Sequence, residues 1–192
     1  MKLKKLVSNK GNILSGPKII NPKIFHDKRG YFYESWNKSL LDENLKGKVD
    51  FVQDNQSCSD CGVLRGLHYQ IHPKPQHKLV SCISGEIFDV AVDIRKSSPT
   101  FGEWGGVKLN NSNKLILWIP FGFAHGFLSL KNGTLVLYKV SGYWSENHEK
   151  AIRWNDKDIN INWPFNEINH IKPILSQKDA RSPFLKETEL FF

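Results

Sequence analysis

The sequence predicts an all-β fold, an antiparallel sandwich or barrel of which the jelly roll is one form. Short stretches rich in strand-forming residues recur along the chain, and glycine, proline and asparagine separate them. Only residues 39–45 (SLLDENL) predict a helix of any strength, with Ser39 as its cap. We expect one domain over residues 1–192, with an N-terminal arm over about 1–12 and a C-terminal segment over about 144–192 that wraps the sheet.

The strands are expected in the middle of the chain, at 63–70, 78–83, 86–94, 105–109, 115–119, 125–130 and 134–140. Within 86–94, apolar side chains alternate with Asp89 and Asp93, so one face of this strand is apolar and the other is polar. Ser84-Gly85 and Asn132-Gly133 predict compact hairpin connections, the second as a type I′ turn.

Charge and composition narrow the partners. The net charge of +8 and the pI of about 9.3 suggest an anionic partner, either nucleic acid or a phosphorylated small molecule. The lysines are scattered rather than gathered into a nucleic-acid-binding run, so no nucleic-acid partner is expected. The apolar stretch 115–130 contains Pro120 and His125, which argues against a membrane helix, and residues 1–12 lack the apolar segment of an export signal.

Three cysteines, an odd and small number, argue against a disulfide framework and for a reducing compartment, so the cytoplasm is expected. Cys58 and Cys61 form a CxxC pair. A structural zinc site needs four ligands, and the sequence has no second pair.

Two signatures of metal-binding jelly rolls of the cupin kind can be compared with this chain. In the first, Gly62 and His68 match, but Gln70 stands at the second histidine and Lys74 or Pro75 at the glutamate. In the second, PxGxxH, the motif is present and ends at His125. The scaffold is therefore cupin-like, whereas two histidines and a glutamine are a poor metal site. We expect no metal, which leaves His68 free to act as a base.

A closer resemblance rests on seven motifs that occur in order from about residue 13 to 185. They are FHDKRGYFYE (25–34), FVQDNQS (51–57), GVLRGLHYQ (62–70), the stretch 78–102, WIPFGFAHGF (118–127), LYK (137–139) and LSQKD (175–179). Together they resemble the dTDP-4-dehydrorhamnose 3,5-epimerases. The resemblance implies an isomerase that needs no cofactor and inverts C3 and C5 of dTDP-4-dehydro-6-deoxy-D-glucose in deoxysugar synthesis, such as that of rhamnose.

By position, the resemblance implies four catalytic residues. His68 removes protons beside the C4 ketone, Tyr138 returns a proton to the opposite face, Asp179 orients His68, and Lys78 lies beside the C4 oxygen. Positions that hold the nucleotide, diphosphate or sugar are Arg29, Glu34, Gln53, Asn55, Arg65, His125, Glu149 and Lys178. The resemblance also implies a homodimer in which residues near 29–34 enter the partner's pocket.

The residue types suit this chemistry. Removal of a proton beside a ketone produces an enolate, and a cation such as Lys78 near the oxygen stabilises the charge that develops. Inversion needs an acid distinct from the base, because the proton returns from the other side. The hydroxyl of Tyr138 can supply it.

Other functions stay open at this point. The nearest are a C3-only epimerase, a 3,4-ketoisomerase and a relative that uses another nucleotide. Ketoisomerases of this fold generally lack the tyrosine, so Tyr138 favours the double epimerase. A non-catalytic module that binds an anionic ligand is a different class, suggested by the +8 charge, and a metal-dependent dioxygenase is a third.

Two details of the motifs raise structural questions. In a regular strand Arg65 and His68 point to opposite faces, so both reach one pocket only if Gly66 marks a bulge or a sharp twist. His77 stands where the family more often has glycine, which places an imidazole next to Lys78 in the sequence.

Overall fold

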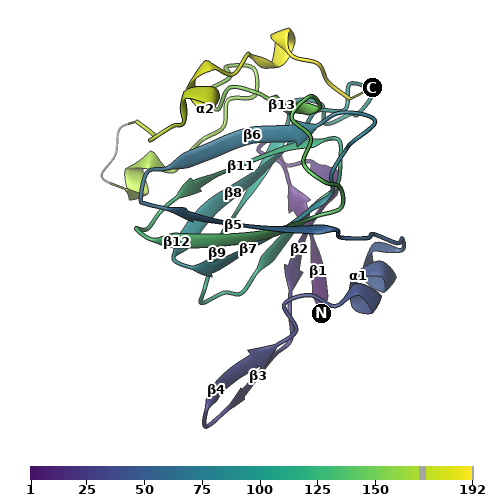
Figure 1. Cartoon of the computed structure of the whole chain (residues 1–192), viewed down its shortest axis with the longest axis vertical. Coiled ribbons are helices and arrows are strands. Elements are labelled where there is room, and N and C mark those ends of the chain that lie inside the picture. The colour runs from purple at the N-terminus through teal and green to yellow at the C-terminus, as the bar shows by residue number, and fades with distance from the viewer. Residues whose placement is uncertain (169–171, 192) are drawn as a thin grey trace.

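The computed structural model describes residues 1–168 and 172–191, and two antiparallel sheets form its body (Figure 1). One sheet has six strands in the order β1 (Lys2–Val7), β2 (Ile13–Asn21), β10 (Ile116–Ile119), β7 (Lys78–Ser84), β12 (Thr134–Val140) and β5 (Gln53–Ser59). The other has five, in the order β13 (Glu149–Ala151), β6 (Leu64–Gln70), β11 (Phe123–Ser129), β8 (Glu86–Asp93) and β9 (Trp104–Asn110). The predicted antiparallel jelly roll is confirmed.

Helices are short and peripheral, as the sequence predicts. They are α1 (Lys38–Leu45), α2 (Gln177–Arg181) and two single 3₁₀ turns, Phe165–Glu167 and Leu185–Glu187. None of the helices in the described residues is long and apolar enough to cross a membrane.

The apolar residues form three layers. One lies between the two sheets and includes Val80, Ala91 and Val136. A second covers the outer face of the five-stranded sheet, where residues of the C-terminal segment such as Trp163 pack. The third lies on the outer face of the six-stranded sheet, where Leu41 of α1 packs. Because apolar layers cover both faces of the five-stranded sheet, its strands read as nearly continuous buried runs.

The alternation predicted for β8 is confirmed. Its apolar residues Phe88, Val90 and Val92 pack in the outer layer, whereas Ala91 faces the other sheet. Asp89 has the same parity as Ala91, so it points between the sheets, where it is fully buried. A carboxylate in that position needs polar neighbours. Among the described residues, His125 hydrogen-bonds Oδ1, whereas Oδ2 has no hydrogen-bond partner.

Both predicted hairpins are wrong. β7 and β8, which flank Ser84-Gly85, lie in different sheets, and so do β11 and β12, which flank Asn132-Gly133. These connections cross from one sheet to the other. Gly85 and Gly133 do have positive φ, 80° and 61°, but a type I′ turn also needs positive φ at Asn132, which does not have it. Turn residues predict a change of direction, not the partner of the next strand.

The helix cap is also corrected. α1 begins at Lys38 and is capped by Asn37, whose side chain accepts a hydrogen bond from the amide of Leu40 at 3.1 Å. Ser39 therefore lies inside the first turn and does not cap the helix. Residues 2–7, expected within an arm, form the edge strand β1 and pair with β2.

A separate two-stranded hairpin, β3 (Ile24–Asp27) and β4 (Gly30–Tyr33), projects away from the sandwich (Figure 1). Its aromatic residues are unusually open to solvent, since Phe25 is 50% and Phe32 67% exposed. Exposed aromatic side chains of this kind are frequent on surfaces that contact other proteins.

Candidate active site

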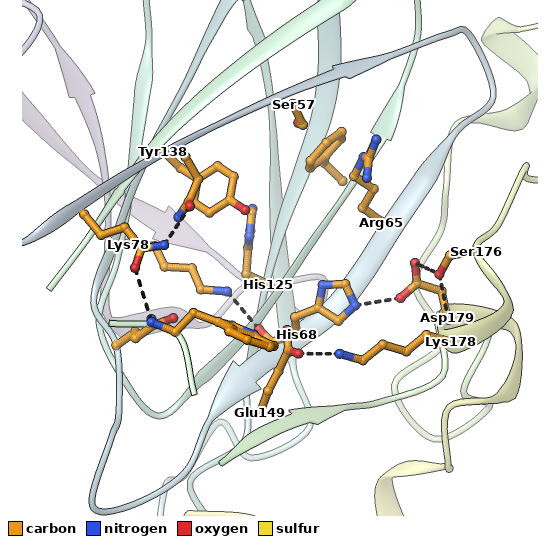
Figure 2. Close-up of a pocket in the computed structure, with 15 residues that line it drawn as sticks. Ser57, Arg65, His68, Lys78, His125, Tyr138, Glu149, Ser176, Lys178 and Asp179 are labelled. Carbon is orange, nitrogen blue, oxygen red and sulfur yellow. Dashed lines mark hydrogen bonds and ion pairs between the residues drawn. The ribbon is translucent and has the colours of Figure 1, made fainter. Parts of the chain in front are cut away.

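A cavity of about 530 Å³ opens between the two sheets and is lined by side chains from both (Figure 2). Ten of the twelve residues singled out in the sequence line it, namely Gln53, Asn55, Arg65, His68, Lys78, His125, Tyr138, Glu149, Lys178 and Asp179. The structure thus brings together residues from six strands of the two sheets, the edge strand β13 among them, and from α2. Their individual roles stay predictions.

His68 and Asp179 form a close pair. His68 Nε2 lies 2.6 Å from Asp179 Oδ1, and Ser176 Oγ donates to Asp179 Oδ2 at 2.8 Å (Figure 2). Burial acts to raise the pKa of Asp179, but the hydrogen bonds from His68 and Ser176 hold it below its ordinary value. An ionised carboxylate only accepts, so Nε2 carries the proton and Nδ1 of the neutral ring keeps a lone pair.

Lys78, the first residue of β7, is buried at the base of the pocket. Its Nζ donates to the carbonyl oxygen of His68 at 3.1 Å, which holds the ammonium beside the imidazole's own backbone. Burial lowers the pKa of Lys78 to about 8, although the charges of Glu149 and Asp89 oppose the shift. A cation in a partly dry pocket can stabilise an oxyanion.

Tyr138 reaches the pocket from the sheet opposite His68. It lies on β12 of the six-stranded sheet, whereas His68 lies on β6 of the five-stranded sheet. Burial raises the pKa of Tyr138, with the charge of Arg65 acting in the other direction, so the hydroxyl keeps its proton at neutral pH. An imidazole and a protonated phenol therefore line one cavity from two sheets.

A second histidine–carboxylate pair lies deeper. His125 Nε2 is 2.6 Å from Asp89 Oδ1, and both residues are buried. His125 lies directly opposite His68 in the β11–β6 ladder. Burial lowers the pKa of His125, and the carboxylate of Asp89 opposes that shift. The lowered pKa keeps the buried ring neutral, and the ring lines the same cavity as His68.

Arg65 does reach the pocket, and the predicted bulge is confirmed. The β6–β11 register pairs His68 with His125 but Arg65 with Phe127, so β6 has one residue more than β11 across this interval. Gly66 lies in it with φ of 126°, and a Cβ there would lie 2.5 Å from the Cα of Gly126. Only glycine adopts this φ without strain and leaves room for the backbone of Gly126.

Polar groups line the side of the cavity that faces β5 and α2. Gln53 Nε2 donates to Asn55 Oδ1 at 2.7 Å. Lys178 of α2 pairs with Glu149 of β13 (Figure 2). Burial acts to raise the pKa of Glu149, but hydrogen bonds from Lys178 and Trp144 hold it below its ordinary value. These donors and acceptors are suited to a polar, anionic ligand.

Arg29 and Glu34 are the two predicted residues that do not line this cavity. Arg29 is at the tip of the projecting hairpin, where its side chain is 90% exposed and pairs with Asp27 at 2.6 Å. Glu34 follows β4 and accepts a hydrogen bond from Asn37 at 2.8 Å. Neither residue contributes to the pocket of its own chain.

Five further residues line the cavity that sequence reasoning did not single out: Ser57, Gln76, Phe127, Trp144 and Ser176. Alternation was an available signal for two of them. Ser57 continues the series of Gln53 and Asn55 on β5, and Phe127 follows His125 on β11. Gln76, Trp144 and Ser176 lie outside strands, where no periodicity applies.

His77 does not alter the surroundings of Lys78 in the way that its place in the sequence suggests. Its ring stacks on Trp118, with centroids 5.0 Å apart, and its Nδ1 accepts a hydrogen bond from the amide of Phe121 at 3.3 Å. Trp118 belongs to the outer layer of the six-stranded sheet, whereas Lys78 lines the pocket between the sheets. His77 is thus a packing residue.

Within residues 1–168 and 172–191, no group of three or more histidine, cysteine, aspartate or glutamate side chains is placed to hold a metal ion. Gln70, at the position of a cupin ligand, instead hydrogen-bonds main-chain groups. The three cysteines are free thiols.

Comparison with known proteins places these features in one family. A family model described as dTDP-4-dehydrorhamnose 3,5-epimerase matches residues 12–187. A dTDP-4-dehydrorhamnose 3,5-epimerase from Salmonella typhimurium is 52% identical over 172 residues, which cover 90% of this chain and 92% of the relative.

Solved structures agree. A dTDP-6-deoxy-D-glucose-3,5-epimerase from Legionella pneumophila, in complex with dTDP-4-keto-L-rhamnose, is 44% identical with a TM-score of 0.88, over 98% of this chain and 95% of that one. A 3′-monoepimerase from Streptomyces bikiniensis, in complex with dTDP-quinovose, is 31% identical with a TM-score of 0.82, over 89% of this chain and 84% of that one. The fold therefore serves both double and single epimerases, and the sequence is more similar to the double epimerase.

Proposed function

The chain belongs to the dTDP-4-dehydrorhamnose 3,5-epimerase family, and on that premise we propose how its pocket carries out the reaction. It is a nucleotide-sugar epimerase that converts dTDP-4-dehydro-6-deoxy-D-glucose to dTDP-4-dehydro-L-rhamnose, for rhamnose synthesis. The observation that carries the mechanism is the placement of His68 and Tyr138 on opposing sheets around one cavity.

His68 is the base in this mechanism. Its Nδ1 removes the proton from C5 in one round and from C3 in another, each carbon being acidic because it flanks the C4 ketone. The electron pair of the broken C–H bond moves into an enolate. Asp179, 2.6 Å from Nε2, stabilises the imidazolium that forms and holds the ring in one tautomer.

Lys78 supplies the positive charge. The enolate oxygen at C4 gains negative charge as the proton leaves, and an ammonium near it lowers the energy of that state more than that of the ketone. The pKa of about 8 leaves Lys78 mostly protonated at neutral pH.

Tyr138 is the acid. Its hydroxyl donates a proton to the carbon from the face opposite His68, which inverts the centre. The raised pKa keeps that hydroxyl protonated until the carbanion-like carbon requires the proton. Exchange of both residues with solvent then restores the starting protonation states.

The remaining pocket residues bind the nucleotide sugar in this proposal. Gln53, Asn55, Arg65, His125, Glu149 and Lys178 supply donors and acceptors for the nucleotide, the diphosphate and the sugar. Lys78, Lys178 and Arg65 contribute positive charge to the pocket, which favours binding of a diphosphate by this chain of net charge +8.

We further propose a homodimer in which the β3–β4 hairpin enters the partner's pocket and brings Arg29 and Glu34 to the ligand. The exposed aromatics of the hairpin and the 90% exposure of Arg29 support it.

The cytoplasm is the proposed location, supported by three free cysteines. One domain over residues 1–192, in which the C-terminal segment packs on the five-stranded sheet, completes the proposal.

NMR of the sugar after incubation with dTDP-4-dehydro-6-deoxy-D-glucose tests the function. A product inverted at both C3 and C5 is expected, and His68→Asn, which removes the base and little volume, serves as the inactive control. A product inverted at C3 alone would identify a monoepimerase, and a 3-keto product would identify a ketoisomerase.

A further inference from the structure

Gln70 is a buried polar residue that the proposed mechanism does not use. It lies two positions after His68 on β6, so both side chains point to the same face of the sheet, and it is 3% exposed. It pairs across the ladder with Glu149 of β13. A buried amide in this position must find partners or destabilise the fold.

The partners of the Gln70 amide are all main-chain groups. Nε2 donates to the carbonyl oxygens of Lys74, at 2.6 Å, and Tyr143, at 3.3 Å. Oε1 accepts from the amide of Ser145 at 2.7 Å. Both amide protons and the carbonyl oxygen are therefore engaged.

These three bonds join two segments that are far apart in the sequence, residues 71–77 and 141–148, which we call the paired loops. The first connects β6 to β7, and the second connects β12 to β13. A further bond between them runs from Gln76 Nε2 to the carbonyl oxygen of Gly142 at 2.7 Å. Gln70 is distinct because it lies in a strand and holds both loops from the interior.

The paired loops carry part of the pocket wall. Gln76 of the first loop and Trp144 of the second line the cavity, and the second loop leads directly into Glu149. The amide of Trp144 donates to Gln53 Oε1 at 3.3 Å. Bonds between His77 and Ser141 and from the amide of Ile71 to the carbonyl oxygen of His148 hold the ends of the two loops together. The bonds of Gln70 act between these ends, at residues 143 to 145 of the wall.

We propose that Gln70 is a positioning residue for substrate binding. It holds the paired loops so that Gln76, Trp144 and Glu149 are in their binding positions before the nucleotide sugar arrives. This rests on the proposed function for the identity of the ligand. The ladders of β6, β7 and β12 hold His68, Lys78 and Tyr138 independently of the loops. Gln70 thus affects the binding step and not the proton transfers.

The chemistry of the side chain explains why an amide is needed. A glutamate has the same shape but no proton to offer when ionised, and it would face two carbonyl oxygens. A methionine has a similar volume and forms none of the three strong bonds. Gln70→Glu and Gln70→Met therefore remove hydrogen bonds between Gln70 and the paired loops in two different ways.

The test compares these two variants with wild type and with Gln56→Glu, which adds the same charge at an exposed position of β5. We expect KM for the dTDP-sugar and Kd for dTDP, measured by calorimetry, to rise about tenfold in both Gln70 variants, with kcat within about twofold of wild type. In Gln70→Glu the rise should shrink as pH is lowered from about 8 to about 6, because burial beside carbonyl oxygens raises the pKa of the new carboxyl and a protonated one donates again. In Gln70→Met the rise should not depend on pH, and Gln56→Glu should match wild type.

A fall in kcat with unchanged KM, or unchanged KM and Kd in both variants, would overturn the proposal. Failure of both variants to fold, seen as loss of the thermal transition, would also overturn it, because the core rather than the loops would then need Gln70. If wild type itself gave no inversion, the proposed function would be wrong instead. The Kd for dTDP would then still test whether Gln70 positions the paired loops.

Discussion

His68 Nε2 lies 2.6 Å from Asp179 Oδ1, although 111 residues separate the two in the sequence. α2 brings the carboxylate to β6, and the cap of that helix is part of the arrangement. Ser176 caps α2 by accepting from the amide of Asp179, and its hydroxyl also donates to the carboxylate. Ser176 and Asp179, which form the cap of this short helix, therefore also orient the proposed base.

Asp179→Asn should leave the chain folded and reduce kcat by about 10²-fold to 10⁴-fold, because an amide cannot stabilise the imidazolium and can select the wrong tautomer. KM should change far less. Ser176→Ala, which removes one hydrogen bond to the carboxylate, should show a smaller loss in the same direction. Steady-state kinetics would decide, and an Asp179→Asn enzyme with near wild-type kcat would exclude the dyad.

The pKa of Lys78 predicts the alkaline limb of the pH profile. Burial lowers this pKa to about 8, so the ammonium form is present below that value and is lost as the pH rises through it. If the ammonium stabilises the enolate, kcat/KM should fall above pH of about 8. Lys78→Met should be slower by about 10²-fold to 10³-fold and should lack this limb. A wild-type profile that stays flat to pH of about 9.5 would contradict the assignment.

Gly66→Ala should be strongly destabilising, by about 3 kcal/mol or more, because φ is 126° and the new methyl group would lie 2.5 Å from the Cα of Gly126. Gly30→Ala is the matched control, with φ of 134° and open space around the Cβ. It isolates the backbone cost from the clash. Urea unfolding measures both, and equal losses of stability would show that close approach to β11 is not what requires glycine.

Shared pockets predict that two defective chains complement each other. Arg29→Ala would impair the partner's pocket and His68→Asn its own, so a mixed dimer keeps one intact site. Random mixing of equal amounts should recover up to about a quarter of wild-type activity, since half of the dimers are mixed and one of their two sites works. Activity after co-refolding, with mass measured by light scattering, tests this. No recovery in a proven dimer, or a fully active monomer, would exclude the exchange of the hairpin.

Much of the fold could be predicted from local patterns, because the strands of a sandwich are recognisable by the alternation of apolar and polar residues and by their length. The bounds of β6, β8 and β12 fall within one residue of those expected. Which strands pair could not be predicted in this way. Gly85 and Gly133 mark sharp turns, but a turn between sheets and a turn within a hairpin use the same residues.

The same distinction between local pattern and tertiary pairing applies to the residues of the site. Residues in motifs were found from the sequence, and Gly66 pointed to the bulge that brings Arg65 to the pocket. Trp144 and Gln76 were missed because their positions depend on hydrogen bonds between loops rather than on a strand's period. His77 shows the opposite error: it directly precedes β7 and is next to Lys78 in the sequence, but its ring stacks on Trp118 outside the pocket.

The central claim is proton removal and return at two carbons from two faces, and NMR of the sugar after incubation in D2O tests it most directly. Wild type should introduce deuterium at both C3 and C5 with inversion at each. Tyr138→Phe should retain some exchange but lose net inversion, because His68 still removes the proton and the opposing acid is gone. Deuterium at C3 alone, no deuterium at either carbon, or full inversion by Tyr138→Phe would contradict the account.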